Sequence, residues 1–221
     1  MNEARPASPA RVDHPEGVAR LLVVGGHSRS VGKTSLVVDL IRAFPEAAWT
    51  AVKVTQYGHG VCVRHEGGCD CAPQDNRVAL DEERERGTGT DTSRFLAAGA
   101  ARALWLRARQ GRLAEALPLL RAEMARAGNF ILESNTLLQF ARPVLYLVVL
   151  DPAQADFKPS ALQALDRADA FVIRSPLAPA AGSPWPAVAP SLLEGKPLFL
   201  QPQGEALPGD LRKFVQEQYF A

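Results

Sequence analysis

The stretch LLVVGGHSRSVGKTSLVVDL leads an apolar run through a glycine-rich turn into a Gly-Lys-Thr that opens a second apolar run. Gly25 and Gly26 allow a sharp turn after a strand, and the pattern from Gly32 onward predicts a helix whose first backbone N–H groups face back into the loop. Lys33 is then placed to reach the β and γ phosphates of a nucleotide, and the Thr34 hydroxyl to ligate Mg²⁺. These residue types predict a phosphate-binding loop with the mechanics of Walker A.

The spacing of this loop is one residue longer than the usual pattern. Its glycines stand as Gly26-x5-Gly32, and counting five back from Gly32 leads to His27. We therefore expect the loop to bulge near Ser28–Ser30. The alternative is a chance Gly-Lys-Thr at the start of a structural helix, and the strand pattern before it and the amphipathic pattern after it argue against that. The residues expected to contact the nucleotide are Gly26, His27, Ser28, Arg29, Ser30, Val31, Gly32, Lys33, Thr34 and Ser35.

All three cysteines of the chain fall within ten positions, at Cys62, Cys69 and Cys71, beside His59 and His65. Three thiolates and up to two imidazoles suit a tetrahedral zinc ion or part of an iron–sulfur site, and zinc is favoured. The spacing is not that of a standard zinc ribbon, so reduced thiols in a loop are an alternative. A glycine-hinged substrate lid is a third interpretation of the same segment.

The elements that must position these residues follow from short apolar runs and helical patterns. Strands are expected at 20–25, 48–54, 102–107, 129–133, 144–150, 169–174 and 196–201. Helices are expected at 33–44, 91–100, 111–127, 159–167 and 208–219. Pro118 predicts a broken or late start for the third helix. Strands separated by helices predict an α/β three-layer sandwich, with a mainly parallel sheet flanked by helices on both faces.

One domain is expected over residues 19–221, preceded by a polar, proline-rich, disordered tail at 1–18. The stretch 56–90 is too long for an ordinary connection and too polar for the core. We therefore expect an insertion there, which includes the cysteines and histidines described above. Within it, the charge run DEERERG at 81–87 is predicted to form the solvated face of a helix.

Charge and hydropathy exclude some classes of partner. The chain has 25 Lys plus Arg against 24 Asp plus Glu, so no overall field favours nucleic acid or an anionic membrane. No apolar run approaches the roughly 20 residues of a membrane span, and residues 1–18 lack the apolar core of a signal peptide. A cytoplasmic protein is therefore expected, and the sequence leaves a homodimer open.

Four segments occur in an order that suggests a family. They are VVGG with SRSVGKTSL, Lys53-x-Thr55 at the end of the second strand, DTSRFLAAGA at 91–100 and FILESN at 130–135. Over about residues 20–175 the chain resembles the molybdopterin-guanine dinucleotide biosynthesis protein B group. That group lies within the P-loop NTPase class, which includes dethiobiotin synthetase and the metallochaperone GTPases. The resemblance implies the P-loop NTPase fold, a nucleotide with Mg²⁺, and a role in molybdenum cofactor biosynthesis.

Two segments differ from the pattern of this group. After the strand ADAFVI the chain reads RSPL at 174–177, where a guanine-specific member often has Asn-Lys-x-Asp, so both ATP and GTP stay open. KVTQYGHGVC stands where the group tends to have a Lys-His-x-His-like segment. Lys53-Val54-Thr55 equally resembles the Lys-Pro-x-x-Thr of dethiobiotin synthetase, where the lysine helps to hold substrate and phosphate.

The resemblance also implies that Asp91 and Glu133 hold Mg²⁺ or orient a water, with Glu133 at the Walker B position. A carboxylate at the end of an apolar strand is costly unless it is paired or metal-bound, so a structural ion pair is the alternative for Glu133. Asp91 equally suits the N-cap of a helix that begins near Thr92. Asp151, after YLVVL, is a weaker acidic alternative. Lys53 is expected at the site because ligands bind at the carboxyl ends of parallel strands.

These residues predict a P-loop nucleoside triphosphatase or phosphotransferase that acts on the γ-phosphoryl group of ATP or GTP with Mg²⁺. Lys33, Glu133 and Lys53 are the expected catalytic residues, and a small-molecule acceptor or a cofactor-biosynthesis protein is the expected partner. One alternative is a dethiobiotin-synthetase-like ligase or a small-molecule kinase. The other is a nucleotide-switched adaptor or metal chaperone whose cargo the cysteines carry.

Overall fold

The computed structural model describes residues 19–58, 78–126, 128–174, 185 and 188–221. In this part of the chain, eight strands form one sheet: β1 (Arg20–Gly26), β2 (Thr50–Tyr57), β3 (Val78–Glu82), β4 (Arg102–Arg109), β5 (Asn129–Glu133), β6 (Leu145–Leu150), β7 (Ala170–Ile173) and β8 (Leu198–Leu200). Their order is β3-β4-β2-β5-β1-β6-β7-β8. Every neighbouring pair is parallel except β3 with β4, which is antiparallel.

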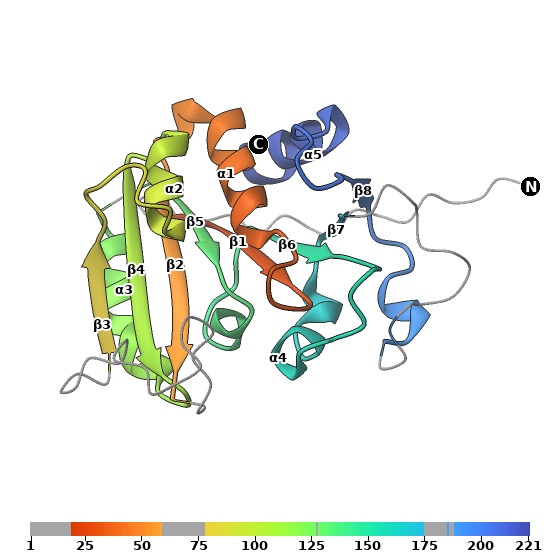
Figure 1. Cartoon of the computed structure of the whole chain (residues 1–221), viewed down its shortest axis with the longest axis horizontal. Helices are drawn as coiled ribbons and strands as arrows, with labels where there is room; N and C mark the ends of the chain where they lie inside the picture. The colour runs from red at the N-terminus through yellow and green to blue at the C-terminus, as the bar shows by residue number, and fades with distance from the viewer. Residues whose placement is uncertain (1–18, 59–77, 127, 175–184, 186–187) are drawn as a thin grey trace, which may run out of the picture.

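Helices cover both faces of this sheet (Figure 1). The α-helices are α1 (Lys33–Ala43), α2 (Asp91–Ala98), α3 (Leu117–Met124), α4 (Pro159–Leu162) and α5 (Gly209–Tyr219). Short 3-10 helices are η1 (Pro45–Ala47), η2 (Leu113–Ala116), η3 (Thr136–Gln139), η4 (Leu165–Arg167) and η5 (Pro190–Leu192). The helices α1, α2 and α5 pack on one face, and α3 and α4 pack on the other. Among the described helices, none has both the length and the apolar character needed to span a bilayer.

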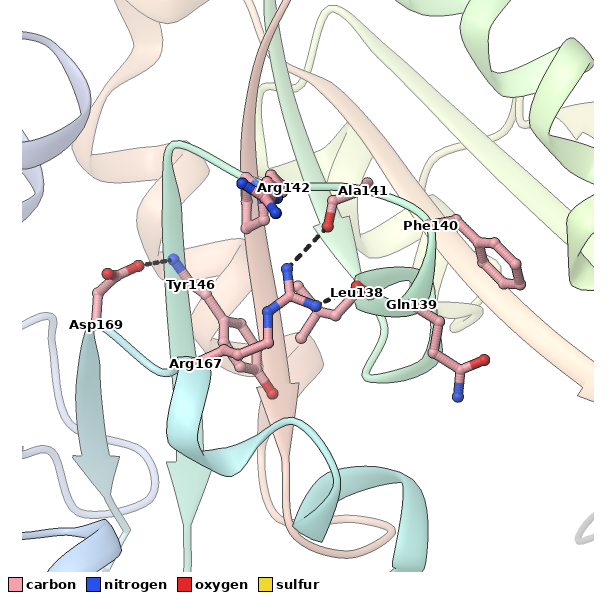
Figure 2. Close-up of a pocket in the computed structure, with 9 residues that line it drawn as sticks. Leu138, Gln139, Phe140, Ala141, Arg142, Tyr146, Arg167 and Asp169 are labelled. Atoms are coloured by element: carbon pink, nitrogen blue, oxygen red, sulfur yellow. Dashed lines mark hydrogen bonds between the residues drawn. The ribbon is translucent and has the colours of Figure 1, made fainter. Parts of the chain in front are cut away.

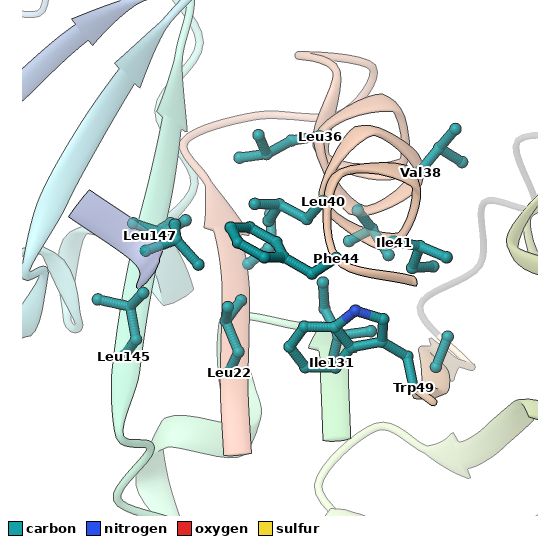
Figure 3. Packing of buried hydrophobic residues seen from close by; sticks show 14 of the residues in the cluster. Leu22, Leu36, Val38, Leu40, Ile41, Phe44, Trp49, Ile131, Leu145 and Leu147 are labelled. Carbon is teal, nitrogen blue, oxygen red and sulfur yellow. The ribbon is translucent and has the colours of Figure 1, made fainter. Parts of the chain in front are cut away.

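Two apolar clusters fill the space between the sheet and its helices. Successive residues of β1 alternate between them: Leu22 packs with α1 and α5, and Val23 packs on the opposite face. Figure 3 shows Leu22 beneath α1, with Leu36 and Leu40 of the helix above it. A sheet that is apolar on both faces requires helices on both faces, as in other parallel sheets. The predicted three-layer α/β sandwich is therefore confirmed.

The structure confirms all seven expected strands, and α1, α2 and α5 lie within two residues of their predicted bounds. The third helix starts late, as Pro118 predicts: η2 comes first, and α3 then begins at Leu117 with Pro118 in its first turn. The continuous helix predicted over 159–167 is wrong, because α4 ends at Leu162 and η4 forms a separate turn that buries Leu165.

The strand β3 was not predicted from the sequence. It pairs antiparallel with β4 at the edge of the sheet, and its last two residues open the charge run DEERERG. Asp81 is ion-paired with Arg107, and Glu82 with Arg102 at 2.8 Å. The predicted helical face is therefore wrong, because these carboxylates find arginine partners across the strands instead.

The end of β1 is too crowded for any side chain. A Cβ atom at Gly25 would lie 2.4 Å from Asn135 Oδ1 and 2.5 Å from Tyr146 Oη, and one at Gly26 would lie 2.8 Å from a methyl group of Val31. The close approach of neighbouring groups therefore requires both glycines, and it brings η3 and β6 against the start of the loop.

Replacing Gly25 with alanine should destabilise the protein by about 1–3 kcal/mol, because the new methyl group must displace Asn135 or Tyr146. Gly209→Ala is the matched control, since a Cβ there meets nothing within 4 Å. It should be neutral or stabilising by up to about 1 kcal/mol, because Gly209 opens a helix. Urea unfolding of both variants measures the difference, and equal stabilities would contradict the crowding at Gly25.

Candidate functional site

The glycine-rich loop joins β1 to α1 at the carboxyl edge of the sheet. Ser30 has φ 56° and Gly32 has φ 92°, so the chain passes twice through the left-handed region before the helix begins. Ser30 lies in the region where a bulge is predicted. Gly32 is the N-cap residue of α1, and no side chain caps this helix end. The first backbone N–H groups of α1 are thus available to an anion.

Lys33 folds back over this loop, and its Nζ donates a hydrogen bond to the Ser28 backbone O at 2.6 Å. Burial lowers the pKa of Lys33 to about 8, with a smaller contribution in the same direction from the nearby cation of Lys158, and the Glu133 carboxylate opposes this shift. Burial also lowers the pKa of Lys158, which lies just before α4 and is close to the guanidinium of Arg29. The sequence analysis missed Lys158, because 125 positions separate it from Lys33 and no motif marks it. Three cations therefore surround the loop.

His27 turns its side chain into the protein rather than towards a ligand. Its Nε2 accepts a hydrogen bond from the Asp151 backbone N–H at 3.1 Å, so its proton is on Nδ1, which donates to the Asp156 backbone O at 2.8 Å. Burial lowers the pKa of His27, and its ring packs against Trp185 and Phe157. The His27 backbone N–H donates to the Val149 backbone O at 3.2 Å, and its C=O accepts from the Lys158 backbone N–H at 2.8 Å. Both the ring and the backbone polar groups of His27 are therefore used within the fold.

The side chains of the other loop residues differ in how accessible they are to a ligand. Ser28 is buried, and its hydroxyl donates to Asp156 Oδ2 at 2.7 Å. Val31 is buried, whereas Arg29 is exposed. The Ser35 hydroxyl accepts a hydrogen bond from Arg94 at 3.3 Å. Ser30 is exposed as well, so Arg29, Ser30 and Ser35 are the loop side chains beside Lys33 and Thr34 that remain accessible.

Two further residues that the sequence analysis missed hold the loop in place. Asn135 Nδ2 donates to the Gly26 backbone O at 2.8 Å, and its Oδ1 accepts from the Gly26 backbone N–H at 2.9 Å. Arg174 Nη2 donates to the Gly32 backbone O at 2.9 Å. Asn135 ends the segment FILESN and Arg174 opens the segment RSPL, so both lay in quoted stretches without an assigned role. They fix the two ends of the loop.

The structure brings four of the predicted residues together beside the loop. The Glu133 carboxylate accepts hydrogen bonds from the Thr34 hydroxyl at 2.8 Å and from Lys53 Nζ at 2.6 Å. Lys53 Nζ also contacts Asp91 Oδ2 at 2.7 Å. The Glu133 side chain is 3% exposed, whereas that of Asp91 is 39% exposed. The ammonium of Lys53 therefore bridges one buried and one accessible carboxylate.

Electrostatic interactions stabilise the charged forms of Lys53 and Asp91. Burial by itself lowers the pKa of Lys53, but Glu133 and Asp91 outweigh it, and the pKa is raised. Burial by itself raises the pKa of Asp91, but Lys53 and the Thr34 hydroxyl outweigh it, and the pKa is lowered. Arg94 Nη1 also lies 4.0 Å from Asp91 Oδ1, so Asp91 has a second cationic neighbour beside Lys53.

The alternative role for Asp91, as a helix cap, is wrong. Thr90 is the N-cap residue of α2, and its hydroxyl accepts a hydrogen bond from the Ser93 backbone N–H at 3.2 Å. Asp91 occupies the first turn and points its carboxylate at Lys53. Asp151 plays a local part instead, since its Oδ1 accepts from the Ala153 backbone N–H at 3.0 Å in the turn after β6.

The donor set fits Mg²⁺. Thr34 offers a hydroxyl, and Glu133 and Asp91 offer carboxylates, all oxygen ligands of the kind that this ion prefers. Within the described ranges, no group of three or more His, Cys, Asp or Glu residues could hold a metal ion by itself. Mg²⁺ suits such an incomplete set, because it keeps several waters and commonly takes phosphate oxygens with one or two carboxylates. The predicted cluster of Cys62, Cys69, Cys71, His59 and His65 lies outside the described residues.

A separate cavity lies away from the phosphate-binding loop. It measures about 660 Å³ and is lined by η3, the loop after it and the amino-terminal ends of β6 and β7 (Figure 2). Two of its charged groups have partners: the Arg167 guanidinium donates to the backbone oxygens of Leu138 and Ala141, and Asp169 accepts from the Tyr146 backbone N–H at 2.7 Å. The Tyr146 hydroxyl is buried and has no hydrogen-bond partner in the described part of the chain.

Comparison with solved structures finds matches to chains of distant sequence. The crystal structure of HypB from Helicobacter pylori in complex with nickel matches with a TM-score of 0.50 and 16% identity, over 93% of this chain and 89% of that chain. The crystal structure of "apo" form LpxK from Aquifex aeolicus in complex with ATP matches with a TM-score of 0.45 and 18% identity, over 82% of this chain and 53% of that chain. No protein-family model and no curated protein sequence matches the chain. The sheet order, the loop and the similarity to HypB show a P-loop NTPase fold.

Lys53→Met should make the protein depend on Mg²⁺ for stability. Removing the ammonium leaves Glu133 buried beside Asp91 without its cation, which should cost about 3 kcal/mol in the absence of metal. Mg²⁺ should then raise the melting temperature of the variant more than that of the wild type, because Lys53 no longer competes for the same oxygens. Thermal unfolding with and without MgCl₂ measures this.

The control for this experiment is Lys213→Met, which removes an exposed lysine that lies 3.8 Å from Glu217 on α5. It should change stability by less than about 1 kcal/mol and leave the response to Mg²⁺ unchanged. An equal Mg²⁺ response in the wild type and Lys53→Met would show that Lys53 does not occupy the cation position.

Proposed function

We propose that this protein binds a nucleoside triphosphate with Mg²⁺ and hydrolyses or transfers its γ-phosphoryl group. One observation carries the proposal: the Thr34 hydroxyl, at the start of α1, is hydrogen-bonded to the buried carboxylate of Glu133 at 2.8 Å. A P-loop hydroxyl in contact with an acid at the end of a neighbouring strand is the arrangement that holds Mg²⁺ against the phosphates in P-loop NTPases.

The loop supplies the groups that bind phosphate. The uncapped N–H groups of α1 point at the anion, and the Lys33 ammonium would exchange the Ser28 carbonyl for phosphate oxygens. Lys158 and Arg29 add positive charge on the same side. Thr34, Glu133 and Asp91 would hold Mg²⁺, which would neutralise charge on the β and γ phosphates.

Lys53 lies on the side of Glu133 away from the loop, because β2 follows β5 in the sheet order. A nucleophile that attacks the γ-phosphoryl group in line must approach from beyond the phosphates. Lys53 and Asp91 are thus placed to orient either a water or the hydroxyl, amine or carboxylate of an acceptor. Glu133 keeps both Thr34 and Lys53 in position.

The resemblance to the molybdopterin-guanine dinucleotide biosynthesis protein B group supports a narrower role in cofactor biosynthesis, with molybdenum cofactor first. Arg174 begins the segment RSPL, which stands where a guanine-specific member often has Asn-Lys-x-Asp, so the residues there do not support specificity for guanine. This guanidinium is used to hold the Gly32 and Gln201 backbone oxygens instead.

A nucleotide-switched metal carrier is the second candidate. It is supported by the similarity in fold to nickel-bound HypB and by the grouping of Cys62, Cys69 and Cys71 in one segment. Rapid turnover with one small acceptor would favour the phosphotransferase. Slow hydrolysis that accelerates only with a partner protein would favour the carrier.

Glu133→Gln should separate nucleotide binding from turnover. The amide keeps the shape of the side chain but removes the charge, so triphosphate affinity should change by less than about threefold while the hydrolysis rate falls by about a hundredfold or more. Lys33→Ala should instead lose most of the affinity. Calorimetry and phosphate-release assays with ATP and GTP measure both, and Glu46→Gln, an exposed acid at the far end of α1, is the control. Equal triphosphate binding by the wild type and Lys33→Ala would refute the proposal.

Triphosphate affinity should fall at alkaline pH because of Lys33. Its pKa of about 8 in the free protein means that it is charged below pH 8 and neutral above it. Since phosphate binding needs the charged form, the apparent affinity should decline by up to about tenfold per pH unit above pH 8. Lys33→Arg stays charged throughout and should abolish the decline. Binding isotherms between pH 6 and 10 test this, and a decline shared by Lys33→Arg would assign it to another group.

A further inference from the structure

The face of the sheet that carries Glu133 and Lys53 continues towards the edge strand β3. The strand register pairs Glu133 with Lys53, Lys53 with Trp105, and Trp105 with Asp81. Side chains directly across neighbouring strands point to the same face, so these four lie in one row. The row begins next to the phosphate-binding loop and ends at the edge of the sheet.

Beyond this row, β2 and β4 extend past the helix that covers them. The next side chains on the same face are Thr55 of β2, with Arg107 and Arg109 of β4. Trp105 and Arg107 are only partly buried and Arg109 is exposed, whereas Leu104 and Leu106 on the opposite face are buried. We name Thr55, Trp105, Arg107 and Arg109 the platform.

Figure 1 shows that α2 lies over one end of β2 and β4, while the rest of both strands runs on with no described helix in front of it. Parallel strands normally have both faces covered. A stretch directly beyond the site that no helix of the described residues covers is therefore unusual, and it suits a surface that a ligand covers.

The indole of Trp105 is held rigidly on the platform. Its Nε1 donates a hydrogen bond to the Thr55 hydroxyl at 3.0 Å, and the Arg107 guanidinium lies 4.5 Å from the centre of its ring. The indole and the guanidinium over it form one preorganised surface. Such a pair favours a flat ligand, because stacking on a fixed ring needs little further ordering of the protein.

The positive charge of the platform indicates that its ligand carries an anionic group. Asp81 pairs with Arg107, but the Nε of Arg107 is buried without a hydrogen-bond partner in the described part of the chain. Arg109 has no ion pair with any described residue, so the platform carries a net positive charge. Guanidinium groups bind carboxylates and phosphates with paired hydrogen bonds.

We propose that the platform binds a second substrate, a planar aromatic small molecule that carries a carboxylate or phosphate group. Its ring packs on the Trp105–Arg107 pair, its anion meets Arg109, and its other end faces Lys53. The assignment as second substrate rests on the proposed function, because it depends on a nucleotide in the neighbouring loop. The binding of a planar anion to the platform does not rest on the proposed function, because it needs no nucleotide.

The experiment uses FMN and pyridoxine 5′-phosphate as planar anions of two sizes, titrated into the full chain without nucleotide and followed by the fluorescence of each probe. Riboflavin and pyridoxine test the ring without the anion, and inorganic phosphate tests the anion without the ring. At least one phosphorylated probe should bind with a submillimolar Kd, and its unphosphorylated counterpart should bind at least about tenfold more weakly.

Two platform variants assign the binding to these residues. Trp105→Ala should weaken probe binding by about tenfold, and Trp105→Phe should restore most of it, because a smaller ring still stacks. Arg109→Gln should weaken the phosphorylated probe and leave its unphosphorylated counterpart unchanged. Thermal unfolding checks that each variant is folded. A purely structural Trp105 would change stability without changing probe binding, and that result would overturn the proposal.

Lys33→Ala distinguishes the platform from the phosphate-binding loop. It should bind the probes as the wild type does, although it loses triphosphate affinity. If Lys33→Ala abolishes probe binding, the probe occupies the loop, which overturns the platform and leaves the proposed function intact. If the wild type binds probes through Trp105 but binds no triphosphate, the proposed function fails and the platform stands. Failure of both phosphorylated probes to bind with a submillimolar Kd would also overturn the platform.

Discussion

The site depends on one carboxylate, which is buried at the end of an interior strand of the sheet. Glu133 ends β5, and its side chain is 3% exposed, so its charge would cost several kcal/mol without partners. The hydroxyl of Thr34 and the ammonium of Lys53 supply those partners from α1 and β2. One buried acid therefore fixes the position of the phosphate-binding helix relative to the strand beside it. The same oxygens that stabilise the folded chain are those that suit Mg²⁺.

The loop itself is ordered by contacts that come from three distant parts of the chain. His27 is held by the turn after β6, Asn135 holds Gly26 from the turn after β5, and Arg174 holds Gly32 from the end of β7. A loop that is already ordered in the folded protein need not be ordered when phosphate binds, so less binding energy is lost. The left-handed backbone at Ser30 persists because these contacts fix both ends of the segment around it.

Local patterns in the sequence predict most of the fold and the central residues of the site. The features that they do not predict depend on contacts between distant segments. The loop is a contiguous motif, Glu133 ends an apolar strand, and Lys53 follows the apolar residues at the start of β2, so a local pattern marks each of them. The run Thr90-Asp91-Thr92-Ser93 contains several good cap residues, and only the structure shows that Thr90 is the cap. The strand β3 could not be predicted because its stability comes from arginines of β4 rather than from its own polar sequence. Lys158 and Arg174 have no motif, since their roles depend on where β6 and β7 end.

Strand order and the two-residue alternation of side chains explain why the loop, the acid and the platform share one face. A shift of one residue in the pairing of β2 with β5 would turn Lys53 to the opposite face and leave Glu133 buried without its ammonium. The buried acid therefore selects the register of β2, and β2 in turn sets the register of β4 and the position of Trp105. At the edge, Asp81 of β3 pairs with Arg107 and closes the row, so that the indole lies within the sheet rather than at an open edge. The interaction that positions the metal ligands thus also determines where the platform lies.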